Sequence, residues 1–114
     1  MIDEIQAGRD TDRRVAEALG YEVEEADGFL EMRSPCDLVG PQLYGWTKLS
    51  RFSTGIGAAW RLAEKLMKRH IVRISNGDGD SCDVDIITAN VHITADTFPL
   101  AICRAFLKIA EEER

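Results

Sequence analysis

Residues 71–87 constrain the fold more than any other stretch, because their pattern fits a β-hairpin. Residues 71–75 are rich in β-branched side chains, and in residues 82–87 apolar side chains alternate with two aspartates. The intervening run 76–80 holds two glycines and two aspartates, which favour a tight turn. A hairpin requires antiparallel pairing, and the alternation predicts that one face of the second strand turns inward. Its expected inward residues are Cys82, Val84 and Ile86.

A second extended region covers residues 21–33. Tyr21 and Val23 alternate with acidic neighbours, Asp27-Gly28 is a turn signal, and a further short strand follows. This pattern predicts another hairpin, although Asp27-Gly28 is also compatible with one corner of a longer loop. Residues 88–94 either extend the sheet or lead into the last helix.

Three helices are expected around these hairpins. The first covers residues 11–19, capped by Asp10 or Thr11 and ended by Gly20. The central helix covers residues 54–69, and the last begins near Asp96-Thr97, with Pro99 in its first turn. The apolar stripe of the central helix comprises Ile56, Ala59, Trp60, Ala63, Leu66 and Met67. The inner face of the last helix comprises Ile102, Cys103, Phe106, Ile109 and Ala110.

The order helix, hairpin, helix, hairpin, helix predicts an α+β chain. With 114 residues, the chain is expected to be one domain spanning residues 1–114. We expect the two hairpins to join into one mostly antiparallel sheet that the three helices cover, which gives a layered sandwich.

Composition restricts the class of function. A net charge of −6 argues against binding to a nucleic-acid polymer, which requires a basic surface. No signal peptide and no apolar run of about 20 residues is visible, so we expect a cytoplasmic protein without a membrane partner. Three widely spaced cysteines, Cys36, Cys82 and Cys103, favour reduced and mostly buried thiols over disulfides.

The segment 51–60 is the best candidate for a binding site. Ser53 or Thr54 can cap the central helix, and Gly55 leaves its first turn bare, so the backbone N–H groups are open to an anion. Arg51 adds a cation that can donate charge-assisted hydrogen bonds to a phosphate. The alternative is an ordinary capped amphipathic helix that binds nothing.

Two further parts of the sequence are candidates for the same ligand. Residues 34–50 form a long loop, either functional or a poorly ordered insertion, in which Tyr44 and Trp46 can stack on a base. Arg104 lies in the first turns of the last helix and either faces the ligand or forms a structural salt bridge, for example with Asp96.

Catalytic and metal-binding motifs are not found in the sequence. His70 and His92 have no serine or cysteine partner at a recognisable catalytic spacing, and there is no phosphate-binding loop motif. The acidic run after Asn76 fails as a calcium loop, because Ser81 stands where glycine is needed and Ile87 where glutamate is needed. We therefore expect no metal and no cofactor.

Three segments, taken together and in order, resemble a known family. They are residues 1–17, residues 52–66 with the run Phe-Ser-Thr-Gly-Ile-Gly-Ala-Ala-Trp, and residues 95–105 with the run Pro-Leu-Ala-Ile-Cys-Arg-Ala. They are similar to the phage ABA-sandwich family of small phage and prophage proteins. That resemblance implies an α-β-α sandwich and a phage setting. Gly55 stands where the family typically carries aspartate, so an acidic or metal role is not carried over to this position.

These observations predict a phage-encoded binding protein that sequesters a small nucleotide-derived ligand. The ligand class is a cyclic nucleotide or ADP-ribose-type immune signal, held without cleavage, and a homo-oligomer would let two helix starts converge on it. The alternative is a protein–protein interaction module that inhibits or assists a host protein. A nucleotide hydrolase is the minority hypothesis, because the sequence offers neither a catalytic base nor metal ligands.

Overall fold

The computed structural model describes residues 5–26, 28–33, 47–76 and 81–113 of the chain. Within these ranges there are three α-helices: α1 (Arg9–Ala18), α2 (Ile56–Met67) and α3 (Phe98–Glu112). The strands are β1 (Glu22–Ala26), β2 (Phe29–Arg33), β3 (Thr47–Lys48), β4 (Val72–Asn76), β5 (Cys82–Ile86) and β6 (Val91–Ala95), and a 3₁₀ turn, Ile87–Ala89, joins β5 to β6. None of the described helices is long and apolar enough to cross a bilayer.

Both predicted hairpins are confirmed. β1 and β2 pair antiparallel with Ala26 opposite Phe29, and Asp27 of the predicted turn lies outside the described residues. β4 and β5 pair with Asn76 opposite Cys82, and Cys82, Val84 and Ile86 are buried as expected. Of residues 88–94, residues 91–94 extend this sheet as part of β6, which pairs with β5.

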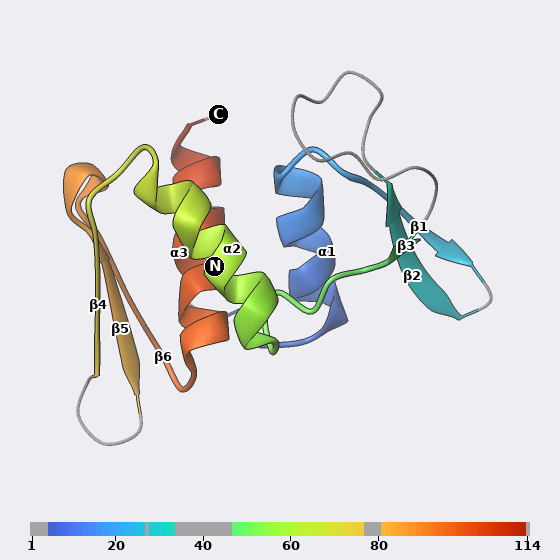
Figure 1. Cartoon of the computed structure of the whole chain (residues 1–114), viewed down its shortest axis with the longest axis horizontal. Helices are drawn as coiled ribbons and strands as arrows, with labels where there is room; N and C mark the ends of the chain where they lie inside the picture. Colours follow the sequence, from blue (N-terminus) through green and yellow to red (C-terminus); the bar gives the residue numbers. More distant parts are fainter. Residues whose placement is uncertain (1–4, 27, 34–46, 77–80, 114) are drawn as a thin grey trace.

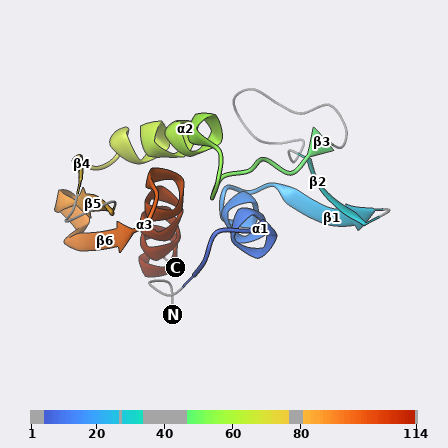
Figure 2. The ribbon, with the colours of Figure 1, turned by 90° about the horizontal axis from the view of Figure 1, so that it is seen from below.

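The hairpins belong to two separate three-stranded sheets, β1-β2-β3 and β4-β5-β6, so the expectation of one joined sheet is wrong in that detail. The helices lie between the two sheets (Figures 1 and 2), so the edges of the two sheets do not meet. Each sheet can then bury one face against helices, which removes the need for a shared edge. The predicted α+β class of antiparallel sheets and three helices holds.

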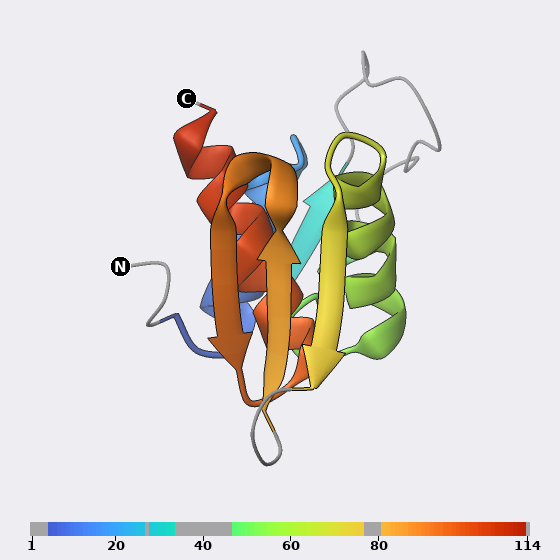
Figure 3. The ribbon, with the colours of Figure 1, turned by 90° about the vertical axis from the view of Figure 1, so that its left-hand side faces the viewer.

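Helix α3 is the centre of the core. It packs against α2, α1, β5 and β6, and every residue from Pro99 to Ala105 is buried. Figure 3 shows it behind the β4-β5-β6 sheet, with α2 at its side. The predicted start is confirmed, since the Thr97 hydroxyl accepts a hydrogen bond from the backbone N–H of Leu100 and Pro99 lies in the first turn.

The predicted inner stripe of α2 is only partly right. Ala59, Ala63 and Leu66 are buried, together with Leu62, which the predicted stripe omitted. Ile56 is instead 70% exposed and Trp60 is 47% exposed, and Met67 is exposed as well. The small side chains of the two alanines lie where α2 packs against α3. The apolar surface of α2 is wider than this contact, so part of that surface stays exposed. The Trp60 ring lies beside the ring of Phe98, with the ring centroids 6.2 Å apart.

The start of α1 also differs from the prediction. The helix begins at Arg9, its N-cap residue is Gly8, and no side chain caps it, so neither Asp10 nor Thr11 has the predicted capping role. The Thr11 hydroxyl instead donates to the carbonyl of Gln6. Gly20, with a φ of +97°, follows the end of the helix as predicted.

Candidate anion-binding site

Ser53 and Asp12 join α1 to the segment that leads into α2. The Asp12 carboxylate, through Oδ1, accepts hydrogen bonds from the Ser53 backbone N–H and the Ser53 hydroxyl, each at 2.7 Å. The backbone N–H of Gly8 donates to the same hydroxyl oxygen at 2.9 Å. Gly8 adopts a φ of +148°, a conformation that glycine accepts at little cost. Ser53 is therefore buried as a structural junction and is not open to a ligand.

The start of α2 is also not capped as predicted. The N-cap residue is Gly55, which has no side chain to cap the first turn, so the predicted capping by Ser53 or Thr54 is wrong. The Gly55 N–H donates to the Arg51 carbonyl at 2.7 Å, and a Cβ at position 55 would lie only 3.0 Å from that oxygen. This close turn favours glycine at position 55, where the family that the sequence resembles typically carries aspartate.

Arg51 and Thr54 line a pocket of about 310 Å³. Its walls come from the start of α1, from β2, from the end of β3 and from the segment that precedes α2. The basic residues in the wall are Arg9, Lys48 and Arg51. These three cations converge on one pocket in a chain whose net charge is −6.

The acidic group in this wall is already engaged. Asp12 also lines the pocket, but its Oδ1 accepts the two bonds from Ser53. Arg9 donates to the carbonyl of Gly28 at 3.3 Å, whereas Lys48 and Arg51 make no side-chain hydrogen bond or ion pair to any described residue. Two cations are therefore available to an incoming anion.

The wall of the pocket also contains apolar residues. These are Phe29, Leu30 and Leu49, and Phe29 is 55% exposed. A ring beside several cations suits a ligand that combines a flat apolar group with negative charge. The volume lies at the lower end of the range for small-molecule sites.

Of the predicted ligand-binding residues, Arg51 and Thr54 lie in this pocket, and Ser53 lies in the buried junction beside it. Tyr44 and Trp46 lie outside the described residues. Arg104 is buried away from the pocket, where it donates from Nε to the Ile5 carbonyl at 2.7 Å and from Nη1 to the Thr94 carbonyl at 3.0 Å. Arg104 therefore links two backbone segments. Its hydrogen bonds go to these two carbonyls and not to Asp96, which the sequence suggested as a salt-bridge partner.

The sequence did not identify Arg9, Phe29 or Lys48 as site residues. They come from three different elements, and only the pairing of β2 with β3 and the docking of α1 bring them together. Glu31 of β2 stands opposite Lys48 of β3, which positions the lysine beside the hairpin. No local pattern at these positions signals a shared pocket.

A separate polar cluster lies on the outer face of the β4-β5-β6 sheet. Asp85 stands opposite Arg73 on one neighbouring strand and His92 on the other, and it hydrogen-bonds to both. The bonds from His92 and then Arg73 lower the pKa of Asp85, and the bond to Asp85 raises the pKa of His92. The cluster is a cross-strand group of ion pairs whose bonds lie at the exposed surface.

The two described cysteines are buried and unpaired, as the sequence predicted. Burial, with the charge of Asp12, raises the pKa of Cys103 to about 12, and burial also raises the pKa of Cys82. Such thiols are poor nucleophiles. Among the described residues no three histidine, cysteine or carboxylate side chains are grouped to hold a metal ion, and residues 77–80 of the acidic turn lie outside that set.

Comparison with known proteins identifies the family. The model of the phage ABA sandwich domain matches residues 15–107, most of the chain. This chain belongs to the phage ABA sandwich domain family. The resemblance seen in the sequence is thus confirmed, and the pocket of this ABA sandwich protein lies largely within the matched range, with Gly8, Arg9 and Asp12 just before it.

A solved structure shares the fold of this ABA sandwich protein. The 2.0 Å crystal structure of a phage protein from Bacillus cereus ATCC 14579 superposes with a TM-score of 0.61. The two sequences are 22% identical, and the match covers 91% of this chain and 92% of the other. No curated protein sequence matches the chain. The likeness at this identity establishes the fold alone, and the link to phage proteins rests on the family.

Proposed function

We propose that this phage protein binds a small nucleotide-derived anion in the pocket lined by Arg9, Lys48 and Arg51. The observation that carries the proposal is the convergence of three cations and one exposed aromatic ring, Phe29, on a single pocket. The cations suit a phosphate or pyrophosphate, and the ring suits a base. A cyclic nucleotide or an ADP-ribose-type molecule combines both chemical features.

Sequestration without cleavage is the role that we propose for this binding. The described histidines and cysteines, His70, His92, Cys82 and Cys103, do not line the pocket, and both cysteines have raised pKa values. A protein that only holds its ligand needs tight binding and no general base. In an infected cell, such a protein would lower the free concentration of a host immune signal.

Binding can be tested by isothermal titration calorimetry with ADP-ribose, cyclic dinucleotides, a mononucleotide and inorganic phosphate. The Arg51→Gln variant should bind roughly tenfold or more weakly, since a hydrogen bond to a charged group contributes about 1.5–3 kcal/mol. Arg61→Gln is the matched control, because Arg61 is an exposed cation on α2 outside this pocket. If no nucleotide binds, or if both variants bind alike, the pocket is not the site.

Sequestration and hydrolysis are separated by recovering the ligand. The complex is incubated, then heat-denatured, and the released compound is examined by mass spectrometry. Intact ligand supports sequestration, and a chemically altered ligand would show that the protein is an enzyme.

A protein–protein interaction module is the second candidate. The observation that favours it is the apolar side chains left on the outer face of α2, Ile56, Trp60 and Met67.

We propose that the same face of α2 forms the contact between subunits of a homo-oligomer. Sedimentation analysis of the wild type and of Trp60→Glu tests this contact: a shift to monomer in the variant supports it, and a monomeric wild type contradicts it.

A further inference from the structure

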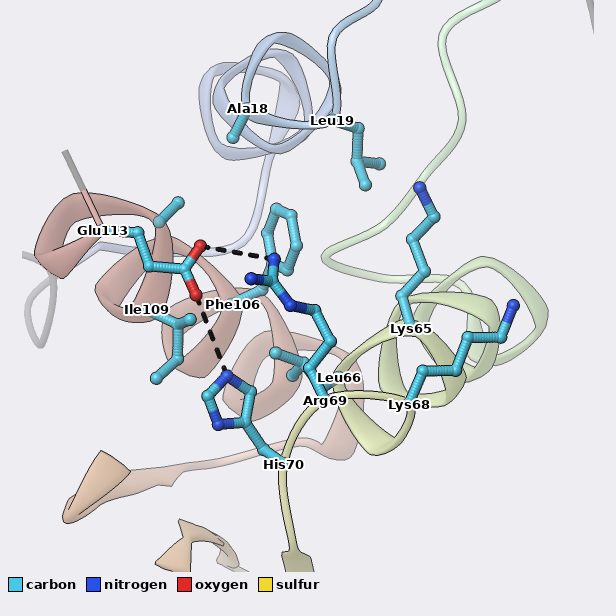
Figure 4. Close-up of a pocket in the computed structure, with 11 residues that line it drawn as sticks. Ala18, Leu19, Lys65, Leu66, Lys68, Arg69, His70, Phe106, Ile109 and Glu113 are labelled. Carbon is cyan, nitrogen blue, oxygen red and sulfur yellow. Dashed lines mark ion pairs between the residues drawn. The ribbon is translucent and has the colours of Figure 1, made fainter. Parts of the chain in front are cut away.

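A second pocket lies at the opposite end of the helix layer from the start of α2. Its volume is about 370 Å³, and the C-terminal ends of α1, α2 and α3 surround it (Figure 4). We call it the C-terminal pocket and define it by Leu66, Arg69, His70, Phe106, Ile109 and Glu113. None of these residues belongs to the pocket that contains Arg51.

The C-terminal pocket combines an apolar floor with a basic rim. Leu66 from α2 and Phe106 and Ile109 from α3 supply the floor. Lys65, Lys68 and Arg69 supply the rim, against one carboxylate, that of Glu113. Three helix ends bring partial negative charge to this place, and the excess of cations offsets it. The pocket therefore offers apolar contacts at its floor and positive charge at its rim.

Glu113 occupies the most basic corner of this pocket. Its carboxylate lies 3.7 Å from Arg69 Nη1 and 3.9 Å from His70 Nε2 (Figure 4). These distances are those of loose ion pairs and are too long for hydrogen bonds. Glu113 is near the end of α3, and its side chain is about half exposed, so moving it out of the corner disturbs no buried packing.

His70 has an unsatisfied ring nitrogen at this corner. Its Nδ1 is paired with the Thr88 hydroxyl at 2.9 Å, whereas its Nε2 is buried and has no hydrogen-bond partner among the described residues. A buried polar atom without a partner costs free energy, of the order of 1–3 kcal/mol. An anion that reached hydrogen-bond distance of this nitrogen would remove that cost.

We propose that the C-terminal pocket binds a small organic anion with an apolar or aromatic body. Its carboxylate, or a similar acidic group, would lie between Arg69 and His70, and its body would rest on Phe106 and Ile109. Glu113 holds that position when no ligand is bound, and it competes with the ligand for the same two partners. This site is independent of the nucleotide pocket.

The probe is 2-naphthoate, with naphthalene-2-methanol as the uncharged control. Titration of isotopically labelled protein by NMR gives the affinity and shows whether the His70 ring nitrogens shift. Arg69→Gln should weaken binding by roughly tenfold, and Glu113→Gln should strengthen it by roughly two- to fivefold. Glu111→Gln is the matched control, because Glu111 is an exposed glutamate at the same helix end, outside the pocket.

Each outcome of the titration either supports or overturns the proposal. Stronger binding to Glu113→Gln than to Glu111→Gln, with His70 shifts and no effect of Arg51→Gln, supports the proposal. No binding of naphthoate, equal binding of the alcohol, or identical affinities of the two glutamate variants would overturn it. Circular dichroism and thermal melting of each variant confirm that the fold is retained, so loss of binding reports on the site.

Discussion

Asp12 and Ser53, 41 residues apart in the chain, share two hydrogen bonds of 2.7 Å inside the protein. Asp12 is 5% exposed and Ser53 is 1% exposed. The pair fixes the start of α1 against the segment that precedes α2, and each side contributes a cation, Arg9 or Arg51, to the same pocket. The geometry of the candidate site therefore depends on this buried contact between Asp12 and Ser53.

Removing the Ser53 hydroxyl should destabilise the fold. Ser53→Ala leaves the Gly8 N–H without its acceptor and the Asp12 carboxylate with one donor fewer. We expect the free energy of unfolding, measured by urea denaturation, to fall by about 1–3 kcal/mol. The neighbouring Thr54→Ala, at an exposed side chain, should stay within about 0.5 kcal/mol of the wild type. Equal effects of the two changes would contradict the structural role of Ser53.

Arg104 should matter for stability and not for ligand affinity. Arg104→Met keeps much of the buried volume but removes the donors to the Ile5 and Thr94 carbonyls. The loss of these two hydrogen bonds from a charged donor should lower the free energy of unfolding by about 2–3 kcal/mol. Calorimetric titration of the same variant should give unchanged nucleotide affinity per folded molecule. A large loss of affinity without a loss of stability would place Arg104 in the site after all.

The Asp85–His92 pair should make stability depend on pH. Because the pKa of His92 is raised, its contribution is complete below the ordinary value of 6.5 and disappears as pH rises through the folded-state pKa. Because the pKa of Asp85 is lowered, its contribution is complete above 3.8 and disappears as pH falls through the folded-state pKa. The pair therefore stabilises the fold most between these two ordinary values.

An NMR titration of the His92 ring measures this coupling. In Asp85→Asn the pKa of His92 should fall toward its ordinary value, since the hydrogen bond to Asp85 is the largest cause of the shift. Asp83→Asn is the control and should lower it less, because Asp83 acts on His92 only through its charge. An unchanged His92 pKa in Asp85→Asn would show that the pair does not form in solution.

Cys103 should resist alkylation in the folded protein. Its pKa is raised to about 12, so the reactive thiolate is scarce at pH 8, and its side chain is buried. Iodoacetamide followed by peptide mass spectrometry should label Cys103 only after denaturant unfolds the chain. Labelling of Cys103 in native protein at the unfolded rate would indicate that α3 opens readily.

Signals contained in a few neighbouring residues located the hairpins and the last helix correctly, although the caps that they predicted for α1 and α2 were wrong. The pairing of β1 with β2, the alternation in β5 and the Thr97 cap with Pro99 are of this kind. The packing partner of each helix face could not be predicted from such local signals. The apolar arc of α2 includes Trp60 and Leu62, and only the docking of α2 on α3 decides that Leu62 is buried and Trp60 is not.

The sequence by itself thus determined the α+β class, the hairpins, the last helix and two residues of the candidate site, Arg51 and Thr54. Tertiary structure decided that the hairpins form two sheets, that Ser53 turns inward to Asp12, and that Arg9, Phe29 and Lys48 complete the pocket. The physical reason is the separation along the chain over which each effect acts. Periodicity and turn chemistry act over a few residues, whereas a pocket is assembled from side chains that only long-range packing brings together.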